Sequence, residues 1–236
     1  MTALEFVHAV AGGLGPLELT LEPGLHVVLG ASNPDLACLI ELSTGMRAPR
    51  RGRVQIDGID VHASPVLRKR IASVLAHEEL PPGRDVRTAL ARALSLRGVQ
   101  ASADALLEEV GASALAARDP RRLDARERRL AAFALALALN DAPLLALADP
   151  LGLAPDVPHD FVIERCRAHA ERAIVLVATP SLADAVRLGG SCLLLERGRL
   201  TTVQNGAPTV APGLVVRSAA ARRLAALLAA EPAVQS

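Results

Sequence analysis

The sequence predicts an α/β fold with a parallel sheet at its centre. Three short segments, 143–148, 173–178 and 192–195, are continuously apolar, as expected of strands buried on both faces. A helical segment, Phe161–Arg172, separates the first two, and this alternation of strand and helix is typical of parallel sheets. With 236 residues, 51% of them hydrophobic, the chain can bury a large core.

The first sixty residues are predicted to form short strands and turns. Segment 17–21 alternates apolar and polar residues, and 26–29 is a short apolar strand. A helix is expected over 36–46, where the apolar residues fall on one stripe. Segment 53–59 alternates again as an edge strand and contains an Asp-Gly turn.

The middle of the chain, 87–139, is predicted to be helical because it is rich in Ala, Leu, Glu and Arg. A further helix is expected over 219–230. The longest apolar run, Leu130–Leu139, is too short to cross a bilayer, so we expect no direct membrane insertion. The arginine-rich stretch 118–129 is interpreted as the solvent-exposed beginning of a helix.

Composition excludes several classes of function. A net charge of +1 and the absence of Trp and Tyr argue against a nucleic-acid partner. Lys69 is the only lysine, so a mechanism that requires one must use it. Cys38, Cys166 and Cys192 are odd in number and have no metal-ligand spacing, as expected of a reduced cytoplasmic protein.

In order and spacing, the segments of the chain resemble the nucleotide-binding subunit of an ABC transporter. GASNPDLACLIELSTGMRAPRRG has the spacing of the family's phosphate loop and first helix, and LRKRIASVLAHEELPPGRDV resembles the segment through the Q-loop. NDAPLLALADP resembles the approach to the Walker B motif, and IVLVATPSLADAVRL and CLLLERGRL resemble the H-loop strand and the final strand. The resemblance covers about residues 1–205.

The resemblance implies a P-loop NTPase-like ABC ATPase fold. This fold has a parallel core sheet flanked by helices, an N-terminal antiparallel β-subdomain and a helical subdomain. One domain, 1–236, is expected, with 1–75 and 140–205 as the core with its β-subdomain, 76–139 as the helical subdomain and 206–236 as a C-terminal extension.

A phosphate loop binds phosphates through glycine amides, a lysine and a metal-binding hydroxyl. The resemblance places this loop at Gly30, Asn33, Asp35, Leu36, Ala37 and Cys38. Leu36 stands at the lysine position and Ala37 at the hydroxyl position. Pro34 has no N–H, and Asp35 is expected to bring negative charge toward an anionic ligand. Cys38 is expected to be a small buried residue rather than a reactive thiol.

The acidic pair of the Walker B motif is incomplete. Aligned on Pro150, Ala148 stands at the metal-binding aspartate and Asp149 at the catalytic glutamate, one methylene shorter. Aligned on Pro143, Asp149 becomes the metal aspartate and Pro150 takes the catalytic position. Both registers stay open, and each loses half of the pair.

The remaining motifs also lack the side chains with which the family contacts its nucleotide. The signature loop falls on Leu123, Asp124, Ala125, Arg126 and Glu127, without the serine and glycines that bind a dimer partner's nucleotide. Ala76 stands at the Q-loop glutamine and Pro180 at the H-loop histidine. No aromatic residue stands at the adenine-stacking position, and Phe6 is the nearest.

We interpret the chain as a degenerate ABC subunit that has lost ATP hydrolysis and, with the phosphate contacts, ATP binding. No cofactor and no metal are then expected. Its expected partners are a membrane-spanning permease subunit, a paralogous ABC ATPase subunit or both. A cytoplasmic location is expected, at the inner face of the cell membrane when a permease is bound.

Four alternatives remain open. Another fold could mimic the spacing, or the phosphate contacts could have moved to Lys69, Arg50 or Arg51. The chain could still bind or hydrolyse ATP with Mg²⁺ at a non-standard site and so drive transport. It could also be a soluble scaffold outside transport.

Overall fold

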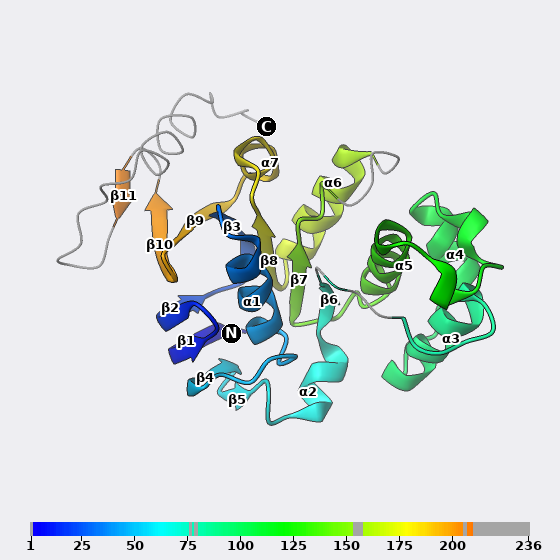
Figure 1. Ribbon diagram of the computed structural model, residues 1–236, viewed down its shortest axis with the longest axis horizontal. Coiled ribbons are helices and arrows are strands. Elements are labelled where there is room, and N and C mark those ends of the chain that lie inside the picture. Colours follow the sequence, from blue (N-terminus) through cyan, green and yellow to red (C-terminus); the bar gives the residue numbers. More distant parts are fainter. Residues whose placement is uncertain (1, 76, 78–79, 153–157, 205–206, 210–236) are drawn as a thin grey trace.

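The chain is built on two β-sheets in a computed structural model that describes residues 2–75, 77, 80–152, 158–204 and 207–209 (Figure 1). The smaller sheet is antiparallel, with strand order β2-β1-β4-β5. Its strands are β1 Leu4–Ala11, β2 Leu14–Leu21, β4 Arg51–Ile56 and β5 Ile59–Asp60. It forms the N-terminal antiparallel β-subdomain that the resemblance implies.

The larger sheet has seven strands in the order β11-β10-β9-β3-β8-β7-β6. The five strands from β9 to β6 in this order run parallel. The strands are β3 Gly24–Gly30, β6 Ala72–Val74, β7 Leu144–Ala148, β8 Ile174–Thr179, β9 Ser191–Glu196, β10 Arg199–Gln204 and β11 Ala207–Thr209. The predicted parallel sheet is confirmed, and its three apolar segments form β7, β8 and β9.

Helices cover both faces of the larger sheet. The described helices are α1 Asn33–Ser43, α2 Pro65–Arg70, α3 Val86–Arg97, α4 Ala103–Glu109, α5 Ala125–Leu137, α6 His159–Ala170 and α7 Leu182–Leu188, with 3₁₀ turns at Ser113–Leu115 and Pro120–Arg122. Helix α1 lies between the two sheets, and α3, α4 and α5 gather beyond β6 (Figure 1). Within the described part of the chain, every helix is too short or too polar to cross a bilayer.

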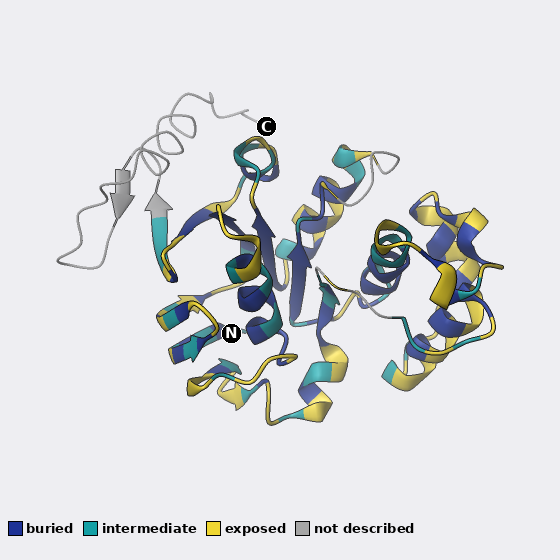
Figure 2. Ribbon diagram, in the orientation of Figure 1, coloured by how far each residue is buried: buried dark blue, intermediate teal, exposed yellow. Residues whose placement is uncertain are grey.

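The strands of the larger sheet divide their side chains between two hydrophobic cores. On β8, Ile174, Leu176 and Ala178 pack with α1 and the smaller sheet. Val175 and Val177 point to the opposite face, into the core formed with α3 to α7. Figure 2 shows β7 and β8 buried along their length, which explains their uninterrupted apolar sequence.

Helix α1 differs from the prediction at both ends. It begins at Asn33 because Ser32 caps it, accepting the Asp35 amide with its hydroxyl at 3.4 Å, and a proline is tolerated in the first turn. It ends at Ser43, shortly before Gly45, whose φ of +72° does not continue a helix. The helix predicted over 219–230 lies outside the described residues.

Candidate functional site

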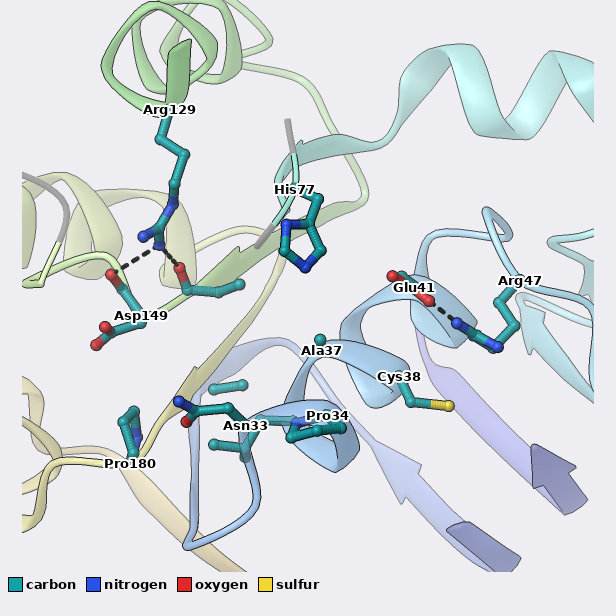
Figure 3. A pocket seen from close by; sticks show the side chains of 13 residues that line it. Asn33, Pro34, Ala37, Cys38, Glu41, Arg47, His77, Arg129, Asp149 and Pro180 are labelled. Atoms are coloured by element: carbon teal, nitrogen blue, oxygen red, sulfur yellow. Dashed lines mark hydrogen bonds and ion pairs between the residues drawn. The ribbon is translucent and has the colours of Figure 1, made fainter. Parts of the chain in front are cut away.

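A pocket opens where the parallel strands β3, β7 and β8 end. Gly30, Ala148 and Thr179 are the last residues of these strands. Ligands of open α/β sheets bind at this carboxyl edge. The pocket has a volume of about 460 Å³ (Figure 3). It is lined by Asn33, Pro34, Leu36, Ala37, Cys38, Glu41, Arg47, His77, Arg129, Ala148, Asp149, Ala178 and Pro180.

The first turn of α1 forms one wall of the pocket through Asn33 and Pro34. Pro34 has no N–H to donate. The amides of Asp35 and Leu36 both donate to the carbonyl oxygen of Ser32, at 3.1 and 3.0 Å. These three positions therefore offer a ligand no backbone donor, although an open helix N-terminus attracts anions.

Leu36, at the lysine position, is part of the hydrophobic core. Its side chain is only 4% exposed and packs between α1 and the smaller sheet, while also lining the pocket. Asp35 points elsewhere, because a Cβ on Gly13 would lie 2.7 Å from its Oδ1. Its carboxylate thus faces the turn between β1 and β2 and not the pocket, contrary to the expectation that it opposes an anionic ligand.

Asp149 follows β7 directly and is held from several sides. Its φ of +49° is rare for a residue other than glycine. Its amide donates to the Ala178 carbonyl at 2.7 Å, and its Oδ1 accepts from the Thr179 hydroxyl at 3.3 Å. A Cβ at Gly152 would lie 2.4 Å from its Oδ2, so a larger residue there would displace this carboxylate.

Asp149 is therefore the carboxylate that could meet a metal ion or a water molecule at the strand ends. Among the described residues, no group of three His, Cys, Asp or Glu side chains could hold a metal ion. Any metal here would have to take most of its ligands from a bound phosphate and from water. Both Walker B registers remain predictions.

Two arginines that the sequence analysis did not single out line the pocket. Arg47 donates from Nε to Oε2 of Glu41 at 2.7 Å. Arg129 reaches down from α5 and donates from one terminal nitrogen to the carbonyl oxygens of Ala148 and, at 3.1 Å, of Asp149 (Figure 3). Arg129 falls in the arginine-rich stretch, but no sequence pattern tells which of its arginines faces the sheet.

The cations considered from the sequence lie elsewhere. Lys69 is exposed on α2, and Arg50 and Arg51 are exposed at the start of β4. None of the three lines the pocket in the described structure. The alternative that they serve a phosphate site is therefore not supported by their positions.

Cys38 and Phe6 are buried. The Cys38 thiol donates to the Ala11 carbonyl at 3.6 Å, and burial raises its pKa, so it is not a thiolate nucleophile. This agrees with the expectation for Cys38. Phe6 is 3% exposed in the core under the smaller sheet, so its ring is not available to stack on a base.

The segment at the signature position starts helix α5. The Asp124 carboxylate accepts the Glu127 amide at 2.8 Å, and the Glu127 carboxylate accepts the Asp124 amide at 3.0 Å. This reciprocal pair is a capping box, which satisfies the first turn of the helix internally. Leu123 is buried, whereas Ala125 and Arg126 are exposed. That this segment does not bind another subunit's nucleotide in the family's usual way remains a prediction.

The Q-loop and H-loop positions are partly described. Ala76 lies outside the described residues, but its neighbour His77 is exposed and lines the pocket. Pro180 also lines the pocket. A proline side chain has no hydrogen-bonding group, so this wall gives a ligand only apolar contact.

The chain is similar to curated import proteins, although no family model matches it. It is 31% identical over 206 residues to a methionine import ATP-binding protein of Caulobacter vibrioides, covering 82% of this chain and 61% of that protein. It is also 31% identical over 181 residues to a thiamine import ATP-binding protein of Mesorhizobium japonicum, covering 74% of this chain and 71% of that protein. The chain thus spans less than two thirds of the first relative.

Solved structures give the same fold. The structure of an ATP-binding subunit of an ABC transporter aligns with a TM-score of 0.71, covering 89% of this chain and 90% of that chain. The sequence identity is 20%, so this likeness concerns the fold alone. The fold expected from the resemblance is confirmed.

The expectation that the chain uses no cofactor is wrong. It rested on missing phosphate-contacting side chains, whereas relatives 31% identical to the chain are ATP-binding proteins. The physical reason lies in the pocket. Its walls come from strand ends and from α1, so replacing single side chains has left a cavity of about 460 Å³ open and lined by two arginines.

Proposed function

Because the chain belongs to the ATP-binding subunits of ABC transporters, we propose that it binds ATP at this pocket as part of an importer. The observation that carries the proposal is the open cavity at the ends of β3, β7 and β8, lined by Arg47 and Arg129. ATP binding here uses a non-standard set of contacts, since the lysine and hydroxyl positions hold Leu36 and Ala37.

The partner in this proposal is a membrane-spanning permease subunit, with or without a paralogous ATPase subunit. The relatives' names as import proteins support it. The chain would then act at the cytoplasmic face of the membrane. The contact with the permease is proposed for segment 76–125, the region between the Q-loop and signature positions in the resemblance.

A second candidate is a regulatory subunit that binds ATP without hydrolysing it. It is favoured by the side chains around Asp149. Ala37 and Ala148 supply no oxygen to a metal ion, and Pro180 supplies no proton donor or acceptor. Both candidates bind ATP, and they differ in whether the ATP is hydrolysed.

The test is isothermal titration of the purified chain with ATP, with and without Mg²⁺, together with a phosphate-release assay. Ala37→Phe places a ring in the pocket, whereas Ala91→Phe places the same ring on the exposed face of α3. We expect saturable ATP binding that Ala37→Phe abolishes and Ala91→Phe preserves. Binding with turnover supports the first candidate, and binding without turnover supports the second. A flat titration at millimolar ATP contradicts both.

A further inference from the structure

Arg129 brings a positive charge to the pocket at the end of β7. Its side chain extends from α5 to this strand end, where it donates to the carbonyl oxygens of Ala148 and Asp149 (Figure 3). These bonds hold the guanidinium at a defined place in the pocket wall. A donor that is already in place needs little reorganisation to meet an anion.

Other side chains of the pocket wall are polar, and the one at the lysine position is apolar. Arg47 is ion-paired with the Glu41 carboxylate at 2.7 Å, and Leu36 takes the place of a lysine in α1. Asn33, on the α1 wall, adds a side-chain amide that points into the pocket (Figure 3). The strand ends therefore present an anion with a guanidinium from α5 and an amide from α1.

We propose that Arg129 contacts the phosphate groups of the bound nucleotide, in place of the lysine that α1 lacks. The inference rests on the proposed function and names the residue that makes the site selective for phosphate. A guanidinium spreads its charge and its N–H donors over three nitrogens, so it can donate a charge-assisted hydrogen bond to a phosphate oxygen while one terminal nitrogen stays bonded to the two carbonyl oxygens. A lysine in α1 would approach the phosphates from the first turn of that helix, whereas the Arg129 guanidinium approaches them from α5.

The next residue of α5 supplies a matched control. Arg128 donates from one terminal nitrogen to the Leu123 carbonyl at 3.0 Å and does not line the pocket. Arg128→Gln removes the same charge from the same helical turn without changing the pocket wall. Arg129→Lys keeps the charge but places all its donors on one nitrogen, so the bonds to the carbonyl oxygens and to a phosphate can no longer come from different nitrogens.

The experiment measures Kd values of ATP, AMP and tripolyphosphate by isothermal titration of the full chain and its variants. Arg129→Gln should weaken ATP and tripolyphosphate binding about tenfold or more, since it removes a charge-assisted hydrogen bond. AMP should change less, because it carries fewer phosphates, so the preference for ATP over AMP falls. Arg129→Lys should be intermediate, and Arg128→Gln should stay within about twofold of wild type.

The ATP-to-AMP preference separates phosphate contact from a structural role. If Arg129→Gln leaves this preference unchanged, the inference is overturned while the ATP site stands. If wild type binds tripolyphosphate in an Arg129-dependent way but does not bind ATP, the proposed function is wrong and the phosphate contact stands. If wild type binds neither ligand, both are overturned. Thermal melting of each variant reports any loss of folding separately.

Discussion

At the scale of single residues, Leu36 serves the core and the pocket together. Its side chain is 4% exposed among the apolar residues between α1 and the smaller sheet, and it also lines the pocket. A longer side chain at this position can keep its stem among the same neighbours and place its end group in the pocket. Nucleotide affinity and stability are therefore coupled at this residue.

Replacing Leu36 by lysine should strengthen ATP binding and weaken the fold. We expect a Kd about tenfold lower, because the ammonium adds a charge-assisted contact. The free energy of unfolding should fall by about 1–3 kcal/mol, because leucine packing is lost. Titration and urea melts measure the two effects. Leu36→Met conserves volume and should leave the ATP Kd unchanged. An unchanged Kd in Leu36→Lys would contradict a phosphate site beside α1.

At the scale of secondary-structure elements, the end of α6 is tied to the loop before β7 by His169. Its ring is 7% exposed, and Nε2 lies 3.1 Å from the carbonyl oxygen of Ala142, which accepts its N–H. Burial lowers the pKa of His169 below the ordinary histidine value of 6.5, and the nearby Arg172 acts in the same direction. The folded state therefore favours the neutral ring.

The lowered pKa of His169 predicts that the folded protein loses stability in acid. The unfolded chain binds the His169 proton more tightly than the folded chain, so its contribution is fully present above about pH 6.5 and is lost as the pH falls through the folded pKa. His169→Gln keeps a donor for Ala142 but does not titrate, so stability should fall less between pH 7.5 and pH 5.5 than in wild type. Urea melts at several pH values measure this, with pH 8 as the internal reference. Parallel pH curves for both proteins would refute the role of His169.

At the scale of the whole molecule, the two hydrophobic cores share one sheet. Because adjacent residues of β7, β8 and β9 point into opposite cores, neither core can lose its strands without exposing the other. This predicts one cooperative unfolding transition, which is also what the expected single domain would give. The helical segment should unfold with the sheet, since residues of α3, α4 and α5 belong to one of these cores.

The buried cysteines provide local probes of this prediction, since the chain has no Trp or Tyr. Cys38 lies in one core and Cys166 and Cys192 in the other, and burial raises the pKa of Cys166 to about 12 and of Cys192 to about 11. Thiol labelling of all three should share one urea midpoint with the circular dichroism transition. Separate midpoints would mean that the cores unfold independently.

One truncation shifts that common midpoint. Phe133 in α5 is 1% exposed, so Phe133→Ala should cost about 3–5 kcal/mol and move every probe equally. Phe161→Ala, at a half-buried ring on α6, is the control and should cost clearly less. A shift confined to Cys166 and Cys192 would argue against a single cooperative unit.

The sequence by itself determined the central strands of the larger sheet and the helical connection between β7 and β8. Apolar runs of strand length predict β7, β8 and β9, because strands covered on both faces need apolar residues at every position. The short strand β6 carries too little pattern to be found in this way. The predicted start of α1, at residue 36, differs from its observed start at Asn33. The reason is that capping by Ser32, and not the apolar stripe, determines where the helix begins.

Only the tertiary structure decided which side chains meet at the pocket. Local sequence shows that Leu36 and Ala37 stand at the lysine and hydroxyl positions of the phosphate loop. It does not reveal that the Asp35 carboxylate points toward Gly13. Nor does it reveal that Arg129, about ninety positions further along the chain than these residues, reaches the end of β7. Periodicity along the chain reports burial, which is a local property. The approach of α5 to the strand ends depends on long-range packing, and the charge of the pocket follows from that packing.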